Sequence, residues 1–169
     1  MYILGDIGNS ETKIFLVNSR YRLIKDISFS SKKINNRVLN SNFNSLTKDY
    51  SKIEKILFCS VVPKSFSLIK KFVYKKIKRK CYEVKDLKLG SLIDINVNYK
   101  QVGSDRLTNA IGLLNHKDNF IILDFGTATT FDVIIKKSYK GGVIAPGIKI
   151  SLNTLSDKAT LIPKINLKK

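Results

Sequence analysis

Two short segments of this chain place a carboxylate, a glycine and hydroxyl side chains directly after an apolar run. They are Asp6–Lys13, with the sequence DIGNSETK, and Asp124–Thr130, with the sequence DFGTATT. A tight turn of this composition can present backbone N–H groups and hydroxyls to an anion such as phosphate. The carboxylate beside it can hold a cation. Both segments could equally be ordinary hairpins in which aspartate and glycine serve only the turn.

The two segments are related by a shift of 118 residues along the chain. With that shift, Ile3–Gly8 falls on Ile121–Gly126, and Thr12 falls on Thr130. A single aspartate-x-glycine turn would be weak grounds for a function. Two copies, each between strand-like runs, favour a duplicated nucleotide-binding half-domain.

In the first segment, individual residue types suit the binding of a phosphate group. Gly8 permits close approach of the backbone. Asn9, Ser10 and Lys13 offer hydrogen-bond donors to phosphate oxygens, although Lys13 could also be a solvated strand residue. Asp6 is placed to hold Mg²⁺, directly or through water.

A third candidate segment, Gly103–Arg106 (GSDR), opens an expected helix for which Ser104 is a suitable cap. A carboxylate beside an arginine at a helix N-terminus could be a base paired with an anion clamp. Asp105 could equally be a residue that caps the helix. The segment alone leaves both interpretations open.

The elements that would position these segments are typical of an α/β protein. The expected strands are Tyr2–Asp6, Thr12–Asn18, Tyr21–Ser30, Lys55–Val62, Cys81–Val84, Phe120–Asp124, Thr130–Lys136 and Tyr139–Ile144. The expected helices lie within Lys32–Asp49, Lys64–Lys80, Gly103–Leu114 and Ile148–Leu155, and Leu87–Gln101 is expected to be a loop. We predict two half-domains with mixed sheets, at residues 1–116 and 117–169. The second has fewer strands and helices than the first, so we expect it to be incomplete.

Composition excludes several classes of protein. With 169 residues and 43% hydrophobic content, the chain can bury a sizeable core. It contains no apolar run of about 18 residues, as a membrane span requires, and Met1 opens directly into strand-like sequence without a signal peptide. A cytoplasmic protein without a membrane partner is therefore expected. Cys59 and Cys81 lack metal-ligand spacing and are expected to be buried and reduced. The single histidine, His116, is expected in a loop.

The net charge of +18 comes mostly from lysines spread along the chain, with only five arginines. Nucleic-acid readers usually concentrate charge on one face and use arginine, so we expect no nucleic-acid partner. The densest basic run, Lys64–Lys80, also carries an apolar stripe of helical period, which indicates an amphipathic helix with a solvated face. The charge is the only feature of the sequence that favours binding of DNA or RNA. The charge should attract anionic substrates such as ATP.

Four motifs, taken in order, resemble those of the type III pantothenate kinases. They are Asp6–Ser10 (DIGNS), Gly103–Asn109 (GSDRLTN), Asp124–Thr130 (DFGTATT) and Gly141–Gly147 (GGVIAPG). The resemblance covers essentially the whole chain. It implies two ribonuclease H-like half-domains of the actin-like ATPase type, in the acetate and sugar kinase/Hsp70/actin superfamily. It also implies a tail beyond residue 169, which would complete the second half-domain.

The resemblance implies phosphorylation of pantothenate by ATP to 4'-phosphopantothenate, the first step of coenzyme A biosynthesis. Asp105 would take the proton from the attacking hydroxyl. Asp124 would bind a monovalent cation, K⁺ or NH₄⁺, and Asp6 would bind Mg²⁺. The residues implied to bind ATP are Asp6, Ile7, Gly8, Asn9, Ser10, Glu11, Thr12, Lys13 and Thr127. Those implied to bind pantothenate are Tyr99, Gly103, Ser104, Asp105 and Arg106.

The chain departs from the family's pattern at two positions. Ser10 stands where threonine is usual. Tyr99 lies only four residues before Gly103, in a segment that lacks the family's proline. Family members are homodimers, so a homodimer is the expected assembly. The competing interpretation is a catalytically inactive, truncated relative that binds nucleotide or serves as an accessory protein.

Overall fold

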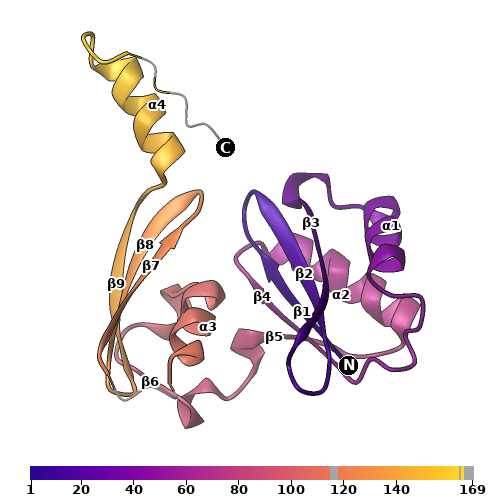
Figure 1. Ribbon diagram of the computed structural model, residues 1–169. Helices are drawn as coiled ribbons and strands as arrows, with labels where there is room; N and C mark the ends of the chain where they lie inside the picture. Colours follow the sequence, from indigo (N-terminus) through magenta and orange to yellow (C-terminus); the bar gives the residue numbers. More distant parts are fainter. Residues whose placement is uncertain (115–117, 164, 166–169) are drawn as a thin grey trace. The chain divides into compact units, whose positions relative to one another are not determined.

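The computed structural model describes residues 1–114, 118–163 and 165, and its elements are labelled in Figure 1. The chain forms two compact units, each with a sheet of its own. Unit 1 comprises Met1–Leu89 and Gly103–Thr108, and unit 2 comprises Gly90–Val102 and Asn109–Lys169. His116, expected in a loop, lies outside the described residues, as does the expected boundary after residue 116.

Unit 1 contains a five-stranded sheet in the order β3-β2-β1-β4-β5. The strands are β1 (Tyr2–Ile7), β2 (Glu11–Val17), β3 (Leu23–Ser30), β4 (Lys55–Ser60) and β5 (Cys81–Glu83). Strand β2 is antiparallel to β1 and β3, whereas β4 is parallel to β1 and β5. The mixed sheet predicted for the first half is confirmed, with strand ends within two residues of those expected.

Two helices, α1 (Asn36–Leu46) and α2 (Pro63–Ile77), pack on this sheet through their apolar faces. Helix α2 begins at a proline, which suits the first helical position because its missing N–H would have no intrahelical partner. Its buried residues include Ile69, Val73 and Ile77, whereas most of its lysines are exposed. The predicted amphipathic helix with a solvated basic face is thus confirmed.

The core of unit 1 fills the space between the sheet and these helices. Its fully buried members include Ile3, Ile7, Ile14, Leu39, Phe43, Ile56, Phe58 and Val73. Gly5 lies opposite Phe58 in the pairing of β1 with β4. A Cβ atom on Gly5 would lie 2.0 Å from the Phe58 ring, so the glycine makes room for that ring.

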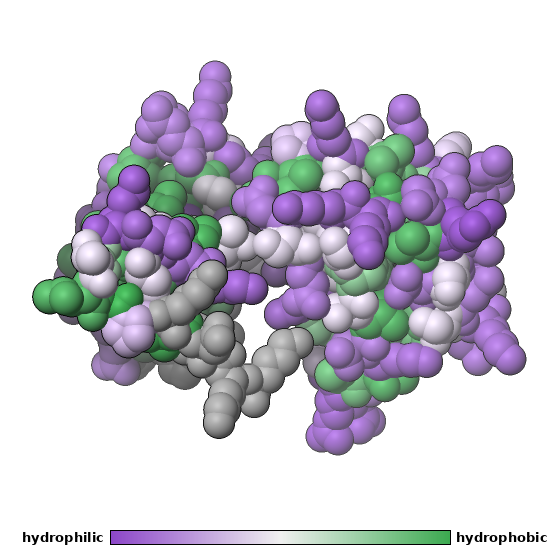
Figure 2. Space-filling view, turned by 90° about the horizontal axis from the view of Figure 1, so that it is seen from above, coloured by the Kyte–Doolittle hydropathy of each residue, from purple (hydrophilic) through white to green (hydrophobic). Residues whose placement is uncertain are grey.

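The surface seen in Figure 2 is largely hydrophilic, with smaller hydrophobic areas between the polar side chains.

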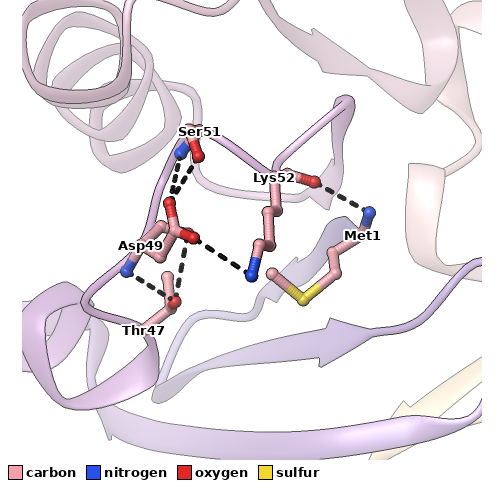
Figure 3. Close-up of polar contacts among 5 residues, drawn as sticks. All are labelled: Met1, Thr47, Asp49, Ser51 and Lys52. Atoms are coloured by element: carbon pink, nitrogen blue, oxygen red, sulfur yellow. Dashed lines mark hydrogen bonds and ion pairs between the residues drawn. The ribbon is translucent and has the colours of Figure 1, made fainter.

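The connection from α1 to β4 is tied to the chain's N-terminus, as Figure 3 shows. The amino group of Met1 donates to the carbonyl oxygen of Lys52 at 2.8 Å. Asp49 accepts hydrogen bonds from the backbone N–H and hydroxyl of Ser51, which lower the pKa of its carboxyl. Its other oxygen lies 3.4 Å from the Lys52 ammonium. These contacts fix the start of β1 beside the entry to β4.

Unit 2 contains a four-stranded sheet in the order β6-β9-β8-β7. Its strands are β6 (Asp94–Ile95), β7 (Phe120–Phe125), β8 (Ala128–Ile135) and β9 (Ser138–Pro146), and helix α4 (Ile148–Lys158) follows. Strand β8 is antiparallel to both neighbours and β6 is parallel to β9, so this sheet is also mixed. Helix α3 (Ser104–Gly112) contributes residues to both units.

The segment Leu87–Gln101, expected to be a loop, contains a strand and short helical turns. Strand β6 pairs with β9, and 3₁₀ turns cover Leu89–Ser91 and Tyr99–Gln101. Elements of two or three residues are too short to show a periodicity in the sequence. The expectation of a loop holds for the rest of the segment, but it missed these short elements.

One face of the second sheet carries exposed apolar side chains. The register places them on neighbouring strands with the same orientation. They are Ile121, Leu123, Phe125, Phe131 and Val143.

Among the described helices, none combines the length and the apolar composition that a membrane span requires.

The two hairpins of the duplicated pattern differ in length by one residue. Lys13 lies opposite Asp6 in the first hairpin, and Thr130 lies opposite the aspartate of the second. The connection in the second hairpin is therefore one residue shorter. As a result, the counterpart of Thr12 is Thr129, which is also buried, and not Thr130 as the uniform 118-residue shift indicates.

Candidate functional site

The first glycine turn, between β1 and β2, is held by contacts to its own ends and to the segment after β3. The backbone N–H of Gly8 donates to the carbonyl oxygen of Glu11 at 3.0 Å, which closes the turn. Ser31 donates its N–H to the carbonyl oxygen of Ser10 at 3.1 Å, and its hydroxyl lies 2.8 Å from that of Thr12. The turn is thus fixed by the fold before any ligand binds.

The eight residues expected to bind ATP in this segment fall into three groups by their exposure. Ile7 and Thr12 are completely buried, so any contact they make with a ligand would come from the backbone. The side chains of Asn9, Ser10, Glu11 and Lys13 are exposed, while Asp6 and Gly8 are partly buried. The Lys13 ammonium lies 3.7 Å from the Glu11 carboxylate, and both side chains are about half exposed, so this pair is loosely held.

The start of helix α3 is anchored to the end of β4 by a serine pair. The Ser104 hydroxyl donates to the carbonyl oxygen of Ser60 at 3.0 Å and accepts the Ser60 N–H at 2.7 Å. Ser104 is the first residue of the helix, and its side chain is 1% exposed. The expectation that Ser104 caps the helix was therefore wrong, because its hydroxyl bonds to a neighbouring strand.

The Asp105 carboxylate is held close to the backbone of the first turn of α3. Its Oδ1 accepts the N–H of Arg106 at 2.8 Å. A Cβ atom on Gly103 would lie 2.3 Å from this oxygen, so the glycine makes room for the carboxylate. Asp105 itself is partly exposed, and the side chain of Arg106 is buried. The residue proposed from sequence as a base is thus preorganised by its neighbours.

Contacts of Cys59, on β4, bring the first turn and the start of α3 together within unit 1. Its Sγ donates to Oδ1 of Asp6 at 3.5 Å. Burial raises the pKa of the Cys59 thiol, and the negative charges of Asp6 and Asp105 raise it further, whereas a hydrogen bond with Thr108 lowers it. The next residue, Ser60, is bonded to Ser104 at the start of α3, so Asp6 and the helix that carries Asp105 are both tied to the end of β4.

The Asp6 carboxylate is the candidate ligand for a metal ion in this region. In residues 1–114, 118–163 and 165, no three histidine, cysteine, aspartate or glutamate side chains cluster to hold one. Mg²⁺ in proteins is commonly bound by one or two carboxylates, with water and substrate phosphate oxygens as the other ligands. The carboxylate of Asp6 beside a glycine turn fits such a site.

The second glycine turn lies in unit 2, between β7 and β8. Asp124, at the end of β7, accepts a hydrogen bond from the Asn109 amide at 3.2 Å. The backbone N–H of Gly147 donates to the carbonyl oxygen of Thr127 at 3.0 Å. A Cβ atom on Gly147 would lie 2.3 Å from the carbonyl oxygen of Gly126. The turn therefore packs tightly on the backbone that leads into α4.

Asn109 and Gly147 were found in the sequence only as members of motifs, without a structural role. Asn109 orients the proposed cation ligand, and Gly147 buttresses the turn that contains Thr127. Tyr99 lies in a 3₁₀ turn of unit 2 and is partly exposed. Gly103–Arg106 belong to unit 1.

Both cysteines are free and buried, as predicted. Burial raises the pKa of Cys81 to about 12, from an ordinary value near 9, and also raises that of Cys59. The neutral thiols therefore favour the folded state below about pH 9, and this contribution is lost as pH rises towards 12.

We expect both thiols to react slowly with iodoacetamide at pH 8 in the folded protein and rapidly in urea. Mass spectrometry of the alkylated chain measures this, and equal rates in both conditions would contradict the burial.

Comparison with known proteins assigns the chain to a family. The family model for type III pantothenate kinase matches residues 2–169. The type III pantothenate kinase of Pelagibacter ubique (strain HTCC1062) is 62% identical over 169 residues, which are 100% of this chain and 68% of that protein.

Solved structures support the fold. A Campylobacter jejuni protein assigned to the Baf family of transcriptional activators matches with a TM-score of 0.55 at 21% identity, over 99% of this chain and 68% of that one. A Sinorhizobium meliloti protein assigned as a 2-dehydro-3-deoxygalactonokinase matches with a TM-score of 0.55 at 9% identity, over 95% and 59%. These similarities confirm the predicted α/β fold with mixed sheets. The match of the family model and the identity to the Pelagibacter enzyme show that the chain belongs to the type III pantothenate kinase family.

Proposed function

We propose that this protein transfers the γ-phosphoryl group of ATP to pantothenate, giving 4'-phosphopantothenate, the first step of coenzyme A biosynthesis. The observation that carries the proposal is the 62% identity, over the whole chain, to an enzyme named for that activity. The geometry of unit 1 agrees with it, because the glycine turn with Asp6 and the helix start with Asp105 are both bonded to the end of β4, at Cys59 and Ser60.

In this proposal Asp105 is the general base. Its carboxylate takes the proton from the pantothenate hydroxyl while the hydroxyl oxygen bonds to the γ-phosphorus and the bond to ADP breaks. The N–H of Arg106 holds the carboxylate in place for this step. Asp6 would hold Mg²⁺, which neutralises charge on the phosphates when it is bound. The bonds of Cys59 to Asp6 and of Ser60 to Ser104 support a shared site within unit 1.

The remaining site residues are assigned by the family motifs. We propose that Asp6–Lys13 and Thr127 contact ATP, the first segment through backbone N–H groups and the side-chain donors of Asn9, Ser10 and Lys13. Tyr99, Gly103, Ser104 and Arg106 would contact pantothenate together with Asp105, although Ser104 is buried and already bonded to Ser60. The Asp124 carboxylate, oriented by Asn109, would bind a monovalent cation, K⁺ or NH₄⁺.

Domain organisation, assembly and location belong to the same proposal. We assign residues 1–116 and 117–169 to the two half-domains, with Gly90–Val102 and the residues from 109 to 114 packing in unit 2 as part of the connection between them. We also assign the protein to the cytoplasm. We also propose a homodimer. The second sheet has an exposed apolar face that includes Ile121, Phe125 and Val143. Exposed apolar patches often mark protein–protein interfaces, so this face supports the proposed homodimer. Sedimentation equilibrium of the purified chain tests the dimer, and a monomer at all concentrations would contradict it.

A phosphoryl-transfer assay decides between the kinase and the inactive nucleotide-binding or accessory relative. The purified 169-residue chain is incubated with ATP, Mg²⁺ and pantothenate, in K⁺ or in Na⁺. We expect 4'-phosphopantothenate to form, with more product in K⁺. Absence of product with intact ATP binding would favour the accessory interpretation, and absence of both would contradict any nucleotide-dependent function.

A further inference from the structure

The thiol of Cys59 contacts the candidate site without any role in the reaction proposed above. Cys59 lies beside Asp6 in the parallel pairing of β4 with β1, so the two side chains are neighbours on one face of the sheet. Its Sγ donates to Oδ1 of Asp6 at 3.5 Å, and its residue surface is 8% exposed. The contact therefore reaches the carboxylate from the protein interior.

A buried thiol has properties that suit the support of a metal-binding carboxylate. It is neutral near pH 7, since the ordinary pKa of a cysteine thiol is about 8.5. A neutral donor leaves the carboxylate's charge available for a cation, whereas a lysine at this position would neutralise it. A hydrogen bond to one carboxylate oxygen also restricts rotation of the group. The thiol can thus orient Asp6 without competing for the ion.

The strand that carries this thiol also connects to helix α3. Within the helix, the Thr108 hydroxyl donates to the carbonyl oxygen of Ser104 at 2.7 Å. Ser104 in turn is bonded to Ser60, the residue after Cys59 on β4. Carboxylate, thiol and helix start are therefore parts of one local network.

We propose that Cys59 is a positioning residue that orients the Asp6 carboxylate for Mg²⁺ and couples this orientation to the helix that carries Asp105. The inference rests on the proposed function for the role of Asp6. The hydrogen bond itself does not, so it can be tested separately.

The first experiment measures the hydrogen bond by infrared spectroscopy of the S–H stretching band. The chain has two cysteines, so Cys81→Ala leaves only the Cys59 thiol and Cys59→Ala leaves only the Cys81 thiol. We expect the Cys59 band at lower frequency than the Cys81 band. Adding Asp6→Ala to Cys81→Ala should move the Cys59 band to higher frequency. A band that Asp6→Ala does not move would overturn the inference, whatever the activity of the protein.

The second experiment measures the Mg²⁺ requirement. Loss of a hydrogen bond from a weak donor to a charged group should raise the Mg²⁺ concentration for half-maximal velocity about three- to tenfold in Cys59→Ala. The KM for pantothenate should not change, and Cys59→Ser should restore most of the effect, because its hydroxyl can donate in the same place. Cys81→Ala is the matched control, since it also removes a buried thiol from the sheet of unit 1.

A purely structural role for Cys59 would lower the melting temperature of Cys59→Ala and leave its Mg²⁺ requirement equal to that of Cys81→Ala. That result would overturn the positioning role even with a shifted S–H band. If wild-type protein lacks kinase activity, the proposed function fails. Calorimetric titration of ATP at several Mg²⁺ concentrations then decides the inference. A Mg²⁺ requirement for ATP binding that is about three- to tenfold higher in Cys59→Ala than in Cys81→Ala supports it, and equal requirements overturn it.

Discussion

Replacement of Asp105 by asparagine is expected to lower kcat for pantothenate phosphorylation by about 10²–10⁴-fold, the usual contribution of a general base. Asparagine keeps the size of the side chain, and its amide oxygen can still accept the N–H of Arg106. The space beside Gly103 remains filled as before. The amide cannot take a proton from the attacking hydroxyl, so only the chemical step should suffer.

Steady-state kinetics together with calorimetric ATP binding separates this effect from misfolding. Affinity for ATP should be unchanged in Asp105→Asn, because the phosphates are assigned to the glycine turns. Asp26→Asn, an exposed aspartate of β3 in the same unit, is the matched control and should retain wild-type kcat. Near-normal turnover of Asp105→Asn would remove the base assignment and leave Asp105 as a residue of the helix start.

The fold was largely predictable because its main elements have a strong local signal. The apolar runs in Lys55–Val62 and Phe120–Asp124 predicted buried strands, and Pro63 marked the start of α2. Strand β4 is largely buried as predicted, but the burial predicted for β7 was wrong, because one face of its sheet is exposed. Strand β6 gave no such signal, since its two residues gain their structure from pairing with β9. Pairing between segments distant in sequence is a tertiary effect that a local pattern does not contain.

The site was predictable as motifs and not as contacts. Asp6 and Asp105 stood out by their neighbours in sequence. The link through Cys59 depends on β1 and β4 being adjacent, although Asp6 and Cys59 are 53 residues apart. Ser104 illustrates the same limit, because a serine before a helix is usually a cap, and its bond to Ser60 appears only when β4 is in place.

The two glycine turns also show why a shared motif does not imply identical use. The shorter connection of the second hairpin places Thr129, and not Thr130, at the buried position that Thr12 occupies in the first. The first turn is supported by Ser31, a residue after the next strand, through a hydroxyl pair. The second is supported by backbone at the start of α4. The second turn therefore depends on the absence of a side chain at Gly147.

Replacement of Gly147 by alanine is expected to destabilise unit 2 by about 3 kcal/mol, at the upper end of the usual cost of overpacking. Its φ of −65° is open to any residue, so the requirement for glycine comes from space alone. The new Cβ would lie 2.3 Å from the carbonyl oxygen of Gly126 and 2.5 Å from that of Thr127. Both are backbone atoms, which cannot rotate away as a side chain does. The turn would have to move, and the hydrogen bond from Gly147 to Thr127 would be strained or lost.

Urea unfolding followed by circular dichroism measures the loss, and ATP titration measures its effect on the proposed nucleotide turn. Gly126→Ala is the matched control for stability, because it adds the same methyl group to the same turn and its nearest contact would be 3.6 Å away. We expect Gly147→Ala to unfold at a clearly lower urea concentration than Gly126→Ala. Since Thr127 is displaced only in Gly147→Ala, weaker ATP binding with partly retained folding would connect the packing of the turn to its proposed function. Equal stability of the two variants would show that the backbone before α4 does not support the turn.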